Sequence, residues 1–239
     1  QQFCVNFQMA LNPQLTKSYA QDDLQTMHSL LIKSSKFSFY ILYIIAVPLM
    51  FEANLVLKLW LGIVPEHTVY FLRLILVVGL LYTLSNPMIV SVHATGKLKK
   101  FQIIEGTMLL MIVPIAYFLL KVFGIAPELV FVVHIIVEIC TQYARIRIVL
   151  PMIQMKLRTY LCEVILPISM VAIISPILPY LLYKNIGQNI VSFLVICSLC
   201  VVCISATVFF VGCKKSEQEF LISKVLGIYK NALERFGKR

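Results

Sequence analysis

The chain has 239 residues, of which 60% are hydrophobic and only 13% are charged, and its formal net charge is +10. Its mean hydropathy is +0.89. Soluble domains have roughly 45–50% apolar and about 25% charged residues, so this composition excludes an ordinary water-soluble fold and indicates an integral membrane protein. The positive charge does not indicate a nucleic-acid partner, because in membrane proteins the distribution of Lys and Arg among the loops matters more than their sum.

Long apolar runs follow one another along the chain, separated by short polar breaks. A spanning helix needs about 20 apolar residues, and continuous runs of this length exclude the alternating pattern of a membrane barrel. We therefore predict an all-α polytopic membrane helix bundle. The predicted complete helices cover residues 37–57, 68–92, 101–121, 126–147, 161–183 and 189–211.

The first residues, QQFCVNFQMALNPQ, include no initiator methionine and no recognisable signal peptide. We expect the chain to be a fragment of a longer polytopic protein, with residues 1–16 as the end of a truncated seventh helix.

Lys and Arg alternate between the breaks. They are concentrated in segments 17–36, 94–100 and 145–160 and in the tail 212–239, whereas the intervening breaks carry one each. By the positive-inside rule, the basic side and the C-terminus are cytoplasmic. Apolar residues at helical spacing with lysines between them predict that the tail is an amphipathic helix on the anionic inner leaflet. An ordinary solvated basic tail is the alternative.

A carboxylate interrupts the apolar run AVPLMFEANLVLKLWLG at Glu52. Lys58 and Trp60 in this run suit the outer interface, but Glu52 stays embedded. Arg73 reaches a similar depth in the next predicted helix, and short-looped neighbours usually pack together, so we predict a Glu52–Arg73 ion pair. The pair either lines an outward-facing cavity, where Arg73 holds a phosphate, or only fastens two helices together.

The segment PELVFVVHIIVEICTQYARIRIVL has the most organised polar pattern in the chain. His134 and Glu138 are four residues apart, and Thr141, Gln142 and Arg145 continue the same helical face. A buried carboxyl group and an imidazole can exchange a proton, which makes His134 and Glu138 candidates for proton or ion coupling. A neutral carboxyl group bonded to a neighbouring helix is the alternative.

Other embedded groups have simpler interpretations. Glu105 and Glu163 lie near the ends of their predicted helices, which is typical of snorkelling or capping charges. Cys197, Cys200 and Cys203 repeat every three residues with no His or carboxylate nearby in the sequence, so we expect small apolar side chains and no metal site.

Four stretches together resemble a known family, the polysaccharide transporter branch of the multidrug, oligosaccharidyl-lipid and polysaccharide flippase superfamily, which includes the Wzx-type O-antigen flippases. The resemblance covers roughly residues 1–147 and rests on a helix that ends in a proline, a basic linker, an LWLG turn and an ATGK loop. The family's small-residue GAA stretch is replaced here by APELVFVV. The stretches are NFQMALNPQLTKSYAQDDLQTMHSLL, SSKFSFYILYIIAVPLMFEANLVLKLWLG, VPEHTVYFLRLIL and SNPMIVSVHATGKLKKFQIIEGTMLLMIVPIAYFLLKV.

The resemblance implies two six-helix lobes, of which residues 1–147 would be most of the second, MATE-like lobe. Residues 148–211 would then be two further terminal helices and residues 212–239 a basic cytoplasmic tail. It also implies a multi-pass protein of the bacterial inner membrane that is not an enzyme. Its function would be to pass an undecaprenyl-linked glycan outward by alternating access, for lipopolysaccharide, capsule or exopolysaccharide synthesis.

The resemblance also suggests residues and partners. Arg73, Glu52 and Asn86, the last within the SNPM motif, are the expected substrate contacts, with no metal and no cofactor beyond a coupling H⁺ or Na⁺. Membrane lipids surround the expected monomer, and a glycan polymerase and glycosyltransferases are the expected protein contacts.

Three other functions remain open. An ion-coupled multidrug exporter of the same superfamily would use Glu138 as its coupling acid. A membrane enzyme such as a glycan polymerase or ligase is disfavoured, because the outer loops have roughly ten residues or fewer and carry no nucleophile motif. A membrane scaffold would use every embedded charge only to fasten helices.

Overall fold

The computed structural model describes residues 2–185, 190–219 and 222–223, and these are helical with no strand among them. The prediction of an all-α polytopic membrane bundle is confirmed. The segments long and apolar enough to cross a membrane are Leu24–Phe51, Thr68–Thr95, Leu98–Phe123, Leu129–Met152, Leu157–Asn185 and Val191–Gly212.

The elements follow one another along the chain with short connections. They are α1 (Gln2–Ala20), α2 (Leu24–Phe51), α3 (Ala53–Leu61), α4 (Thr68–Thr95), α5 (Leu98–Leu110), α6 (Ile112–Phe123), α7 (Leu129–Met152), α8 (Leu157–Tyr160), α9 (Leu166–Ile174), α10 (Ile177–Asn185) and α11 (Ile190–Thr207), with short π-helical turns η1 (Leu161–Ile165) and η2 (Val208–Gly212).

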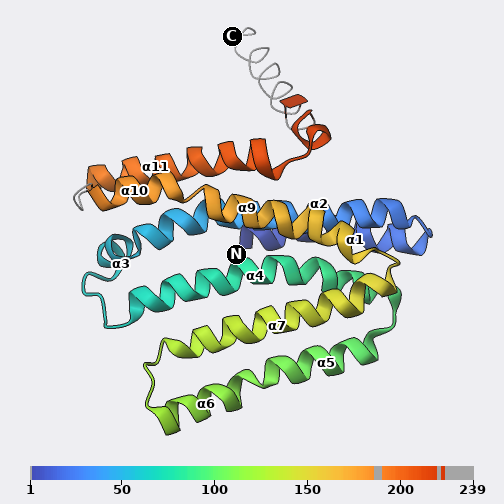
Figure 1. The fold of residues 1–239 in the computed structure, drawn as a ribbon, viewed down its shortest axis with the longest axis horizontal. Coiled ribbons are helices and arrows are strands. Elements are labelled where there is room, and N and C mark those ends of the chain that lie inside the picture. Colours follow the sequence, from blue (N-terminus) through green and yellow to red (C-terminus); the bar gives the residue numbers. More distant parts are fainter. Residues whose placement is uncertain (1, 186–189, 220–221, 224–239) are drawn as a thin grey trace, which may run out of the picture.

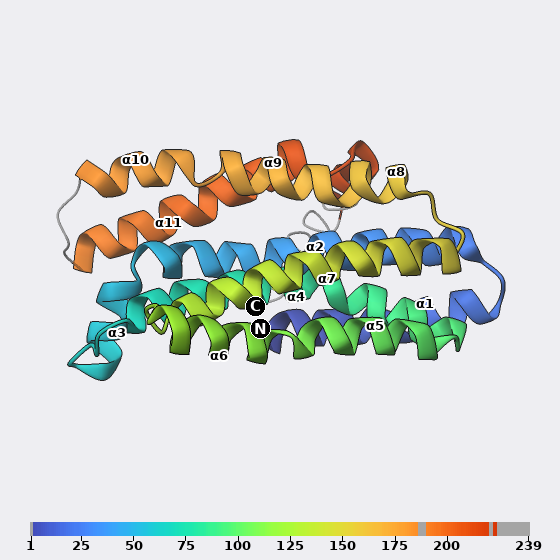
Figure 2. The same ribbon diagram turned by 60° about the horizontal axis from the view of Figure 1, so that its bottom comes forward.

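The long helices lie side by side with their axes roughly aligned (Figure 1). The connections 21–23, 96–97 and 153–156 lie together at one end, which we name the basic end, and α3 lies at the other, which we name the α3 end (Figure 1). α2 is central: it packs on α1 and α4 on one side and on α11 on the other. α7 packs against both α4 and α5. α8 to α11 form a separate layer beyond α2 (Figure 2).

The outer helices present apolar side chains to their surroundings. Leu110, Val113 and Phe123 of the α5–α6 segment are each more than 60% exposed, which is expected where a helix faces lipid.

The second helix begins earlier than the predicted span 37–57. α2 starts at Leu24, where the Asp23 side chain caps it by accepting a 3.0 Å hydrogen bond from the Thr26 N–H. The predicted basic linker 17–36 is therefore mostly helical. Charged residues mark where hydrocarbon ends, whereas a helix continues until its backbone is capped, so the two boundaries differ.

Breaks interrupt several spans, in each case close to a proline. Pro114 cannot donate a hydrogen bond to the carbonyl of Leu110, and α5 ends at that residue. α2 gives way to α3 at Glu52, four residues after Pro48. A further break separates α9 from α10 at Ser175 and Pro176.

The predicted domain boundary at residue 148 falls inside α7, which runs to Met152. The helical layers instead change at the connection 153–156. Within the predicted tail, residues 215–219 and 222–223 are helical, and the remainder of the predicted amphipathic helix lies outside the described residues.

The end of η2 packs tightly on α2. The Tyr40 hydroxyl donates to the Gly212 carbonyl at 3.3 Å, and a Cβ atom at residue 212 would lie 2.8 Å from the Tyr40 oxygen.

We expect Gly212→Ala to lower the free energy of unfolding by about 1–3 kcal/mol, because Tyr40 is buried and the two backbones must separate to admit a methyl group. Thermal unfolding in detergent micelles measures the change. Gly106→Ala is the matched control, since a Cβ there would meet no atom within 4 Å. Equal melting temperatures for the two variants would contradict this packing.

Candidate membrane-embedded charge network

The predicted polar face of α7 is buried inside the bundle. Glu138, Thr141, Gln142 and Arg145 are all buried although they lie within a helix that can cross the membrane. The face points toward α4 and α5, which pack on α7.

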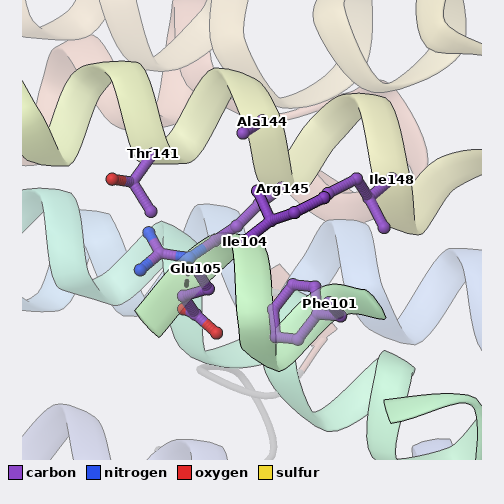
Figure 3. A pocket seen from close by; sticks show the side chains of 7 residues that line it. All are labelled: Phe101, Ile104, Glu105, Thr141, Ala144, Arg145 and Ile148. Carbon is purple, nitrogen blue, oxygen red and sulfur yellow. Dashed lines mark hydrogen bonds and ion pairs between the residues drawn. The ribbon is translucent and has the colours of Figure 1, made fainter. Parts of the chain in front are cut away.

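Arg145 joins three helices. Its Nη1 donates to Glu138 Oε1 on its own helix and to Ser85 Oγ on α4, both at 2.6 Å. Its Nε donates to Glu105 Oε1 on α5 at 2.7 Å, and Figure 3 shows the side chain reaching from α7 to that carboxylate. Gln142 completes the group, with Oε1 3.2 Å from Nη1. The guanidinium is 3% exposed, so its hydrogen bonds replace hydration.

Ser85 is the uncharged hub of this network. Its hydroxyl lies 2.9 Å from Glu138 Oε1 and 3.0 Å from Gln142 Oε1. A hydroxyl has one proton to donate and lone pairs to accept with, so Ser85 accepts from Arg145 and donates to one of these oxygens or to the Leu81 carbonyl at 3.3 Å. Glu138 and Gln142 therefore share the donors that Arg145 Nη1 and Ser85 provide.

The charges of the network do not cancel when every group is ionised. Glu105 and Glu138 share a single guanidinium, which leaves one negative charge in excess. An uncompensated charge at membrane depth is costly and rare, which makes this network the candidate functional site.

The two carboxylates differ in access. The Glu105 side chain is 14% exposed and the Glu138 side chain 6%. Glu105 also borders a narrow groove between α5 and α7 (Figure 3). The groove is lined by Phe101, Ile104, Glu105, Thr141, Ala144, Arg145 and Ile148. Glu105 is therefore the more exposed of the two carboxylates.

A second polar group joins α1 to α4. Asn86 Nδ2 donates to Gln8 Oε1 at 2.6 Å, and Gln8 Nε2 donates to the Thr83 carbonyl at 3.0 Å. Asn86 is half-buried. Gln8 and Thr83 also line a small cavity of about 40 Å³ together with Cys4, Val5, Leu42, Gly79 and Tyr82.

The outward face of α1 carries several polar side chains beside the exposed Met9. Gln2, Asn6, Gln14 and Thr16 are exposed, and Gln2 donates to Asn6 at 3.2 Å. Lipid offers no hydrogen bonds to amide groups, so these amides suit water or a polar protein surface better than hydrocarbon.

The predicted Glu52–Arg73 ion pair is wrong. Arg73 Nε donates to the Met50 carbonyl at 2.9 Å, and no ion pair joins Arg73 to Glu52. Arg73 thus contacts the backbone of the last turn of α2. Glu52 stands at the break between α2 and α3, where it interacts electrostatically with the Cys197 and Cys200 thiols of α11.

The structure shows no direct contact to support the predicted proton exchange between His134 and Glu138. His134 is half-buried and makes no hydrogen bond with Glu138 in the part of the chain that the structure describes. Arg145 and Ser85 take the Glu138 carboxylate instead.

Glu105 is not the snorkelling or capping charge that its position predicted, since it is paired with Arg145. The missed signal was depth. Glu105 lies nine residues from Gly96, and Arg145 eight residues from Ile153, so both stand at the same level above the basic end. Glu163, in contrast, pairs with the half-exposed Lys214 Nζ at 2.7 Å, in agreement with an interfacial position.

A buried ion pair at the basic end was also missed. Lys36 Nζ lies 2.8 Å from Glu217 Oε2, and Lys36 is fully buried. The same carboxylate oxygen accepts the Lys214 N–H at 2.8 Å, as in a helix N-terminal capping box. The pair ties α2 to the start of the tail segment.

Comparisons of the chain with protein-family models, with curated proteins and with solved structures give no match. Among the described residues, no group of three or more His, Cys, Asp or Glu side chains is arranged to hold a metal ion.

We expect Arg145→Gln to lower the free energy of unfolding by about 3–5 kcal/mol, because two buried carboxylates lose their cation. Adding Glu105→Gln should recover part of the loss, which thermal unfolding in micelles would measure. Arg147→Gln is the control, since this α7 arginine is exposed and contacts only Tyr143. An unchanged melting temperature for Arg145→Gln would show that the network is not formed.

We expect Lys36→Ala and Glu217→Ala to destabilise the protein strongly, and the double variant to lose clearly less than the sum of the two, because breaking a buried pair leaves one charge uncompensated. A double-mutant cycle by thermal unfolding gives the coupling free energy. The exposed Lys33→Ala is the control. Simple additivity would contradict a direct pair.

Proposed function

We propose that this chain is most of one lobe of a lipid-linked oligosaccharide flippase, which passes an undecaprenyl-linked glycan across the bacterial inner membrane. The observation that carries a transport function is the buried Glu105–Arg145–Glu138 network at membrane depth. Embedded charges of this kind are rare and usually mark a transport or coupling pathway. The substrate class rests on the sequence resemblance to the polysaccharide transporter branch.

The geometry of Arg73 supports an anionic substrate. Only its Nε is engaged, by the Met50 carbonyl, and its two terminal nitrogens make no hydrogen bond with the described residues. A half-buried guanidinium with its fork free suits bidentate binding of a pyrophosphate. The loss of the predicted Glu52 partner strengthens this role, because no carboxylate of the described residues forms an ion pair with Arg73.

The polar face of α1 and the Gln8–Asn86 group support a hydrophilic pathway beside α4. Amide side chains bind sugar hydroxyls well, since each offers both donors and an acceptor. In this proposal Asn86 and the exposed Gln2 and Asn6 contact the glycan, and a second lobe of the full protein closes the pathway.

The charge distribution supports the orientation. The basic end carries Lys97, Lys99 and Lys100, so it faces the cytoplasm together with the start of the tail. Glycosyltransferases that build the substrate would act on this side, and a polymerase would accept it on the other.

Ion coupling would use the α4–α5–α7 network. Uptake of a proton or Na⁺ at Glu105 would neutralise the excess charge and loosen its bond to Arg145, which lets α5 move against α7. Glu138 stays bound by Arg145 and Ser85 and anchors the network. His134 remains a candidate proton acceptor one turn from Glu138.

An ion-coupled multidrug exporter is the second candidate, and the same network favours it. The two functions differ in what they require of Arg73. A guanidinium with free donors attracts the anionic oxygens of a pyrophosphate, but it gives no binding energy to a cationic drug.

The test is to express the full-length protein in a bacterial strain that lacks its flippase and to measure surface glycan. We expect the wild-type protein to restore the glycan and Arg73→Ala to reduce it roughly tenfold or more, since about 1.4 kcal/mol of lost binding already gives tenfold. Lys58→Ala, an exposed cation at the α3 end, is the control and should restore fully.

Several results would contradict the proposal. Drug resistance without glycan restoration would identify an exporter. If Arg73→Ala is present in the membrane at the wild-type level and still restores the surface glycan fully, Arg73 is not part of the substrate site.

A further inference from the structure

Glu52 is a buried carboxyl group that neither the charge network nor the substrate pathway uses. It stands between α2 and α3, with its N–H bonded to the Pro48 carbonyl and its own carbonyl accepting from the Val56 N–H, both at 3.0 Å. The residue is 4% exposed.

The groups around Glu52 include no compensating cation. α11 contributes the Cys197 and Cys200 thiols, which interact with it electrostatically. α10 contributes Tyr180 and Tyr183, whose rings contact the adjacent Phe51.

The nearest cationic side chains of the neighbouring elements are engaged or directed elsewhere. Arg73 of α4 is bonded to the Met50 carbonyl, and Lys58 of α3 is exposed. In the described part of the chain, no Lys, Arg or His nitrogen lies within 4.0 Å of the Glu52 carboxylate.

We propose that Glu52 is a proton-binding site that controls the packing of α11 on the α2–α3 junction. An ionised carboxylate that is 4% exposed and has no cation within 4.0 Å among the described residues costs several kcal/mol even after relaxation of its surroundings, so the carboxyl group is neutral while α11 is packed. Loss of the proton requires water, and water reaches Glu52 when α11 separates from the junction. The proton therefore stabilises the packed form as pH falls, and this stabilisation is lost as pH rises.

The position of the fixed contacts determines how α11 can move. Its far end is held to α2 by the Tyr40–Gly212 hydrogen bond and, just beyond, by the buried Lys36–Glu217 pair. Cys197 and Glu52 lie toward the α3 end, away from these contacts. Separation is therefore a hinged opening at the α3 end, about contacts at the basic end that stay closed. This inference depends on membrane insertion and not on the identity of the transported substrate.

Cys200 reports the opening, because it is fully buried in the packed form. The first experiment uses the full-length protein in membranes with Cys200 as its single cysteine, labelled by a small maleimide across a range of pH. Ionisation of the thiol itself also accelerates labelling as pH rises. At each pH the labelling rate is therefore divided by the rate of the same single-cysteine protein that also carries Glu52→Gln, whose side chain is neutral at every pH.

We expect the rate ratio to rise with pH by up to about tenfold per pH unit, as the open population follows ionisation of one carboxyl group. Glu66→Gln, an exposed glutamate of the connection 62–67, is the matched control and should leave the rise unchanged. A ratio that stays constant with pH, including the case in which neither protein is labelled, overturns the proposal.

A second experiment detects the proton directly. Infrared difference spectra of the protein in lipid at neutral pH, wild type minus Glu52→Gln, should show the C=O absorption of a protonated carboxyl group. The wild type minus Glu66→Gln should not. Absence of this band from the wild type minus Glu52→Gln spectrum overturns the proposal. The proposal does not depend on the result of the flippase assay.

Discussion

The guanidinium of Arg145 is the interaction on which the centre of the bundle depends. Hydrocarbon offers no hydrogen bonds, so every charge buried in it must find a partner within the protein. One side chain meets this need for two carboxylates and a serine, and by doing so it fixes α4 and α5 against α7. With every group ionised, the network keeps one negative charge in excess, and the proposed ion coupling rests on this charge.

α2 organises the rest of the molecule through its different sides. One side meets α4 and offers the Met50 carbonyl to Arg73 Nε. The junction between α2 and α3 places Glu52 near α11. Lys36, nearer the basic end, holds the start of the tail through Glu217. A candidate substrate contact, a candidate proton site and a fixed clamp thus all lie along α2 and its junction with α3.

Much of the candidate site could be anticipated, and the failures have a common cause. Helical spacing alone placed Glu138, Thr141, Gln142 and Arg145 on one face, and that face is buried. Their partners on other helices could not be read in the same way, because spacing within α7 says nothing about which helix faces it. Glu105 was therefore assigned to the interface. Lys36 was placed in a linker because a lone lysine in the sequence gives no sign of Glu217.

The sequence by itself determined that the chain is a bundle of membrane-crossing helices, since apolar run length and the cost of unpaired backbone groups in lipid leave no other fold for it. It also determined which residues are unusual at that depth. Tertiary structure alone decided the partners. The end of α2 gave Arg73 the Met50 carbonyl in place of Glu52, and the packing of α5 on α7 brought Glu105 to Arg145. Such contacts depend on side-chain fit between helices distant in sequence, which no local pattern records.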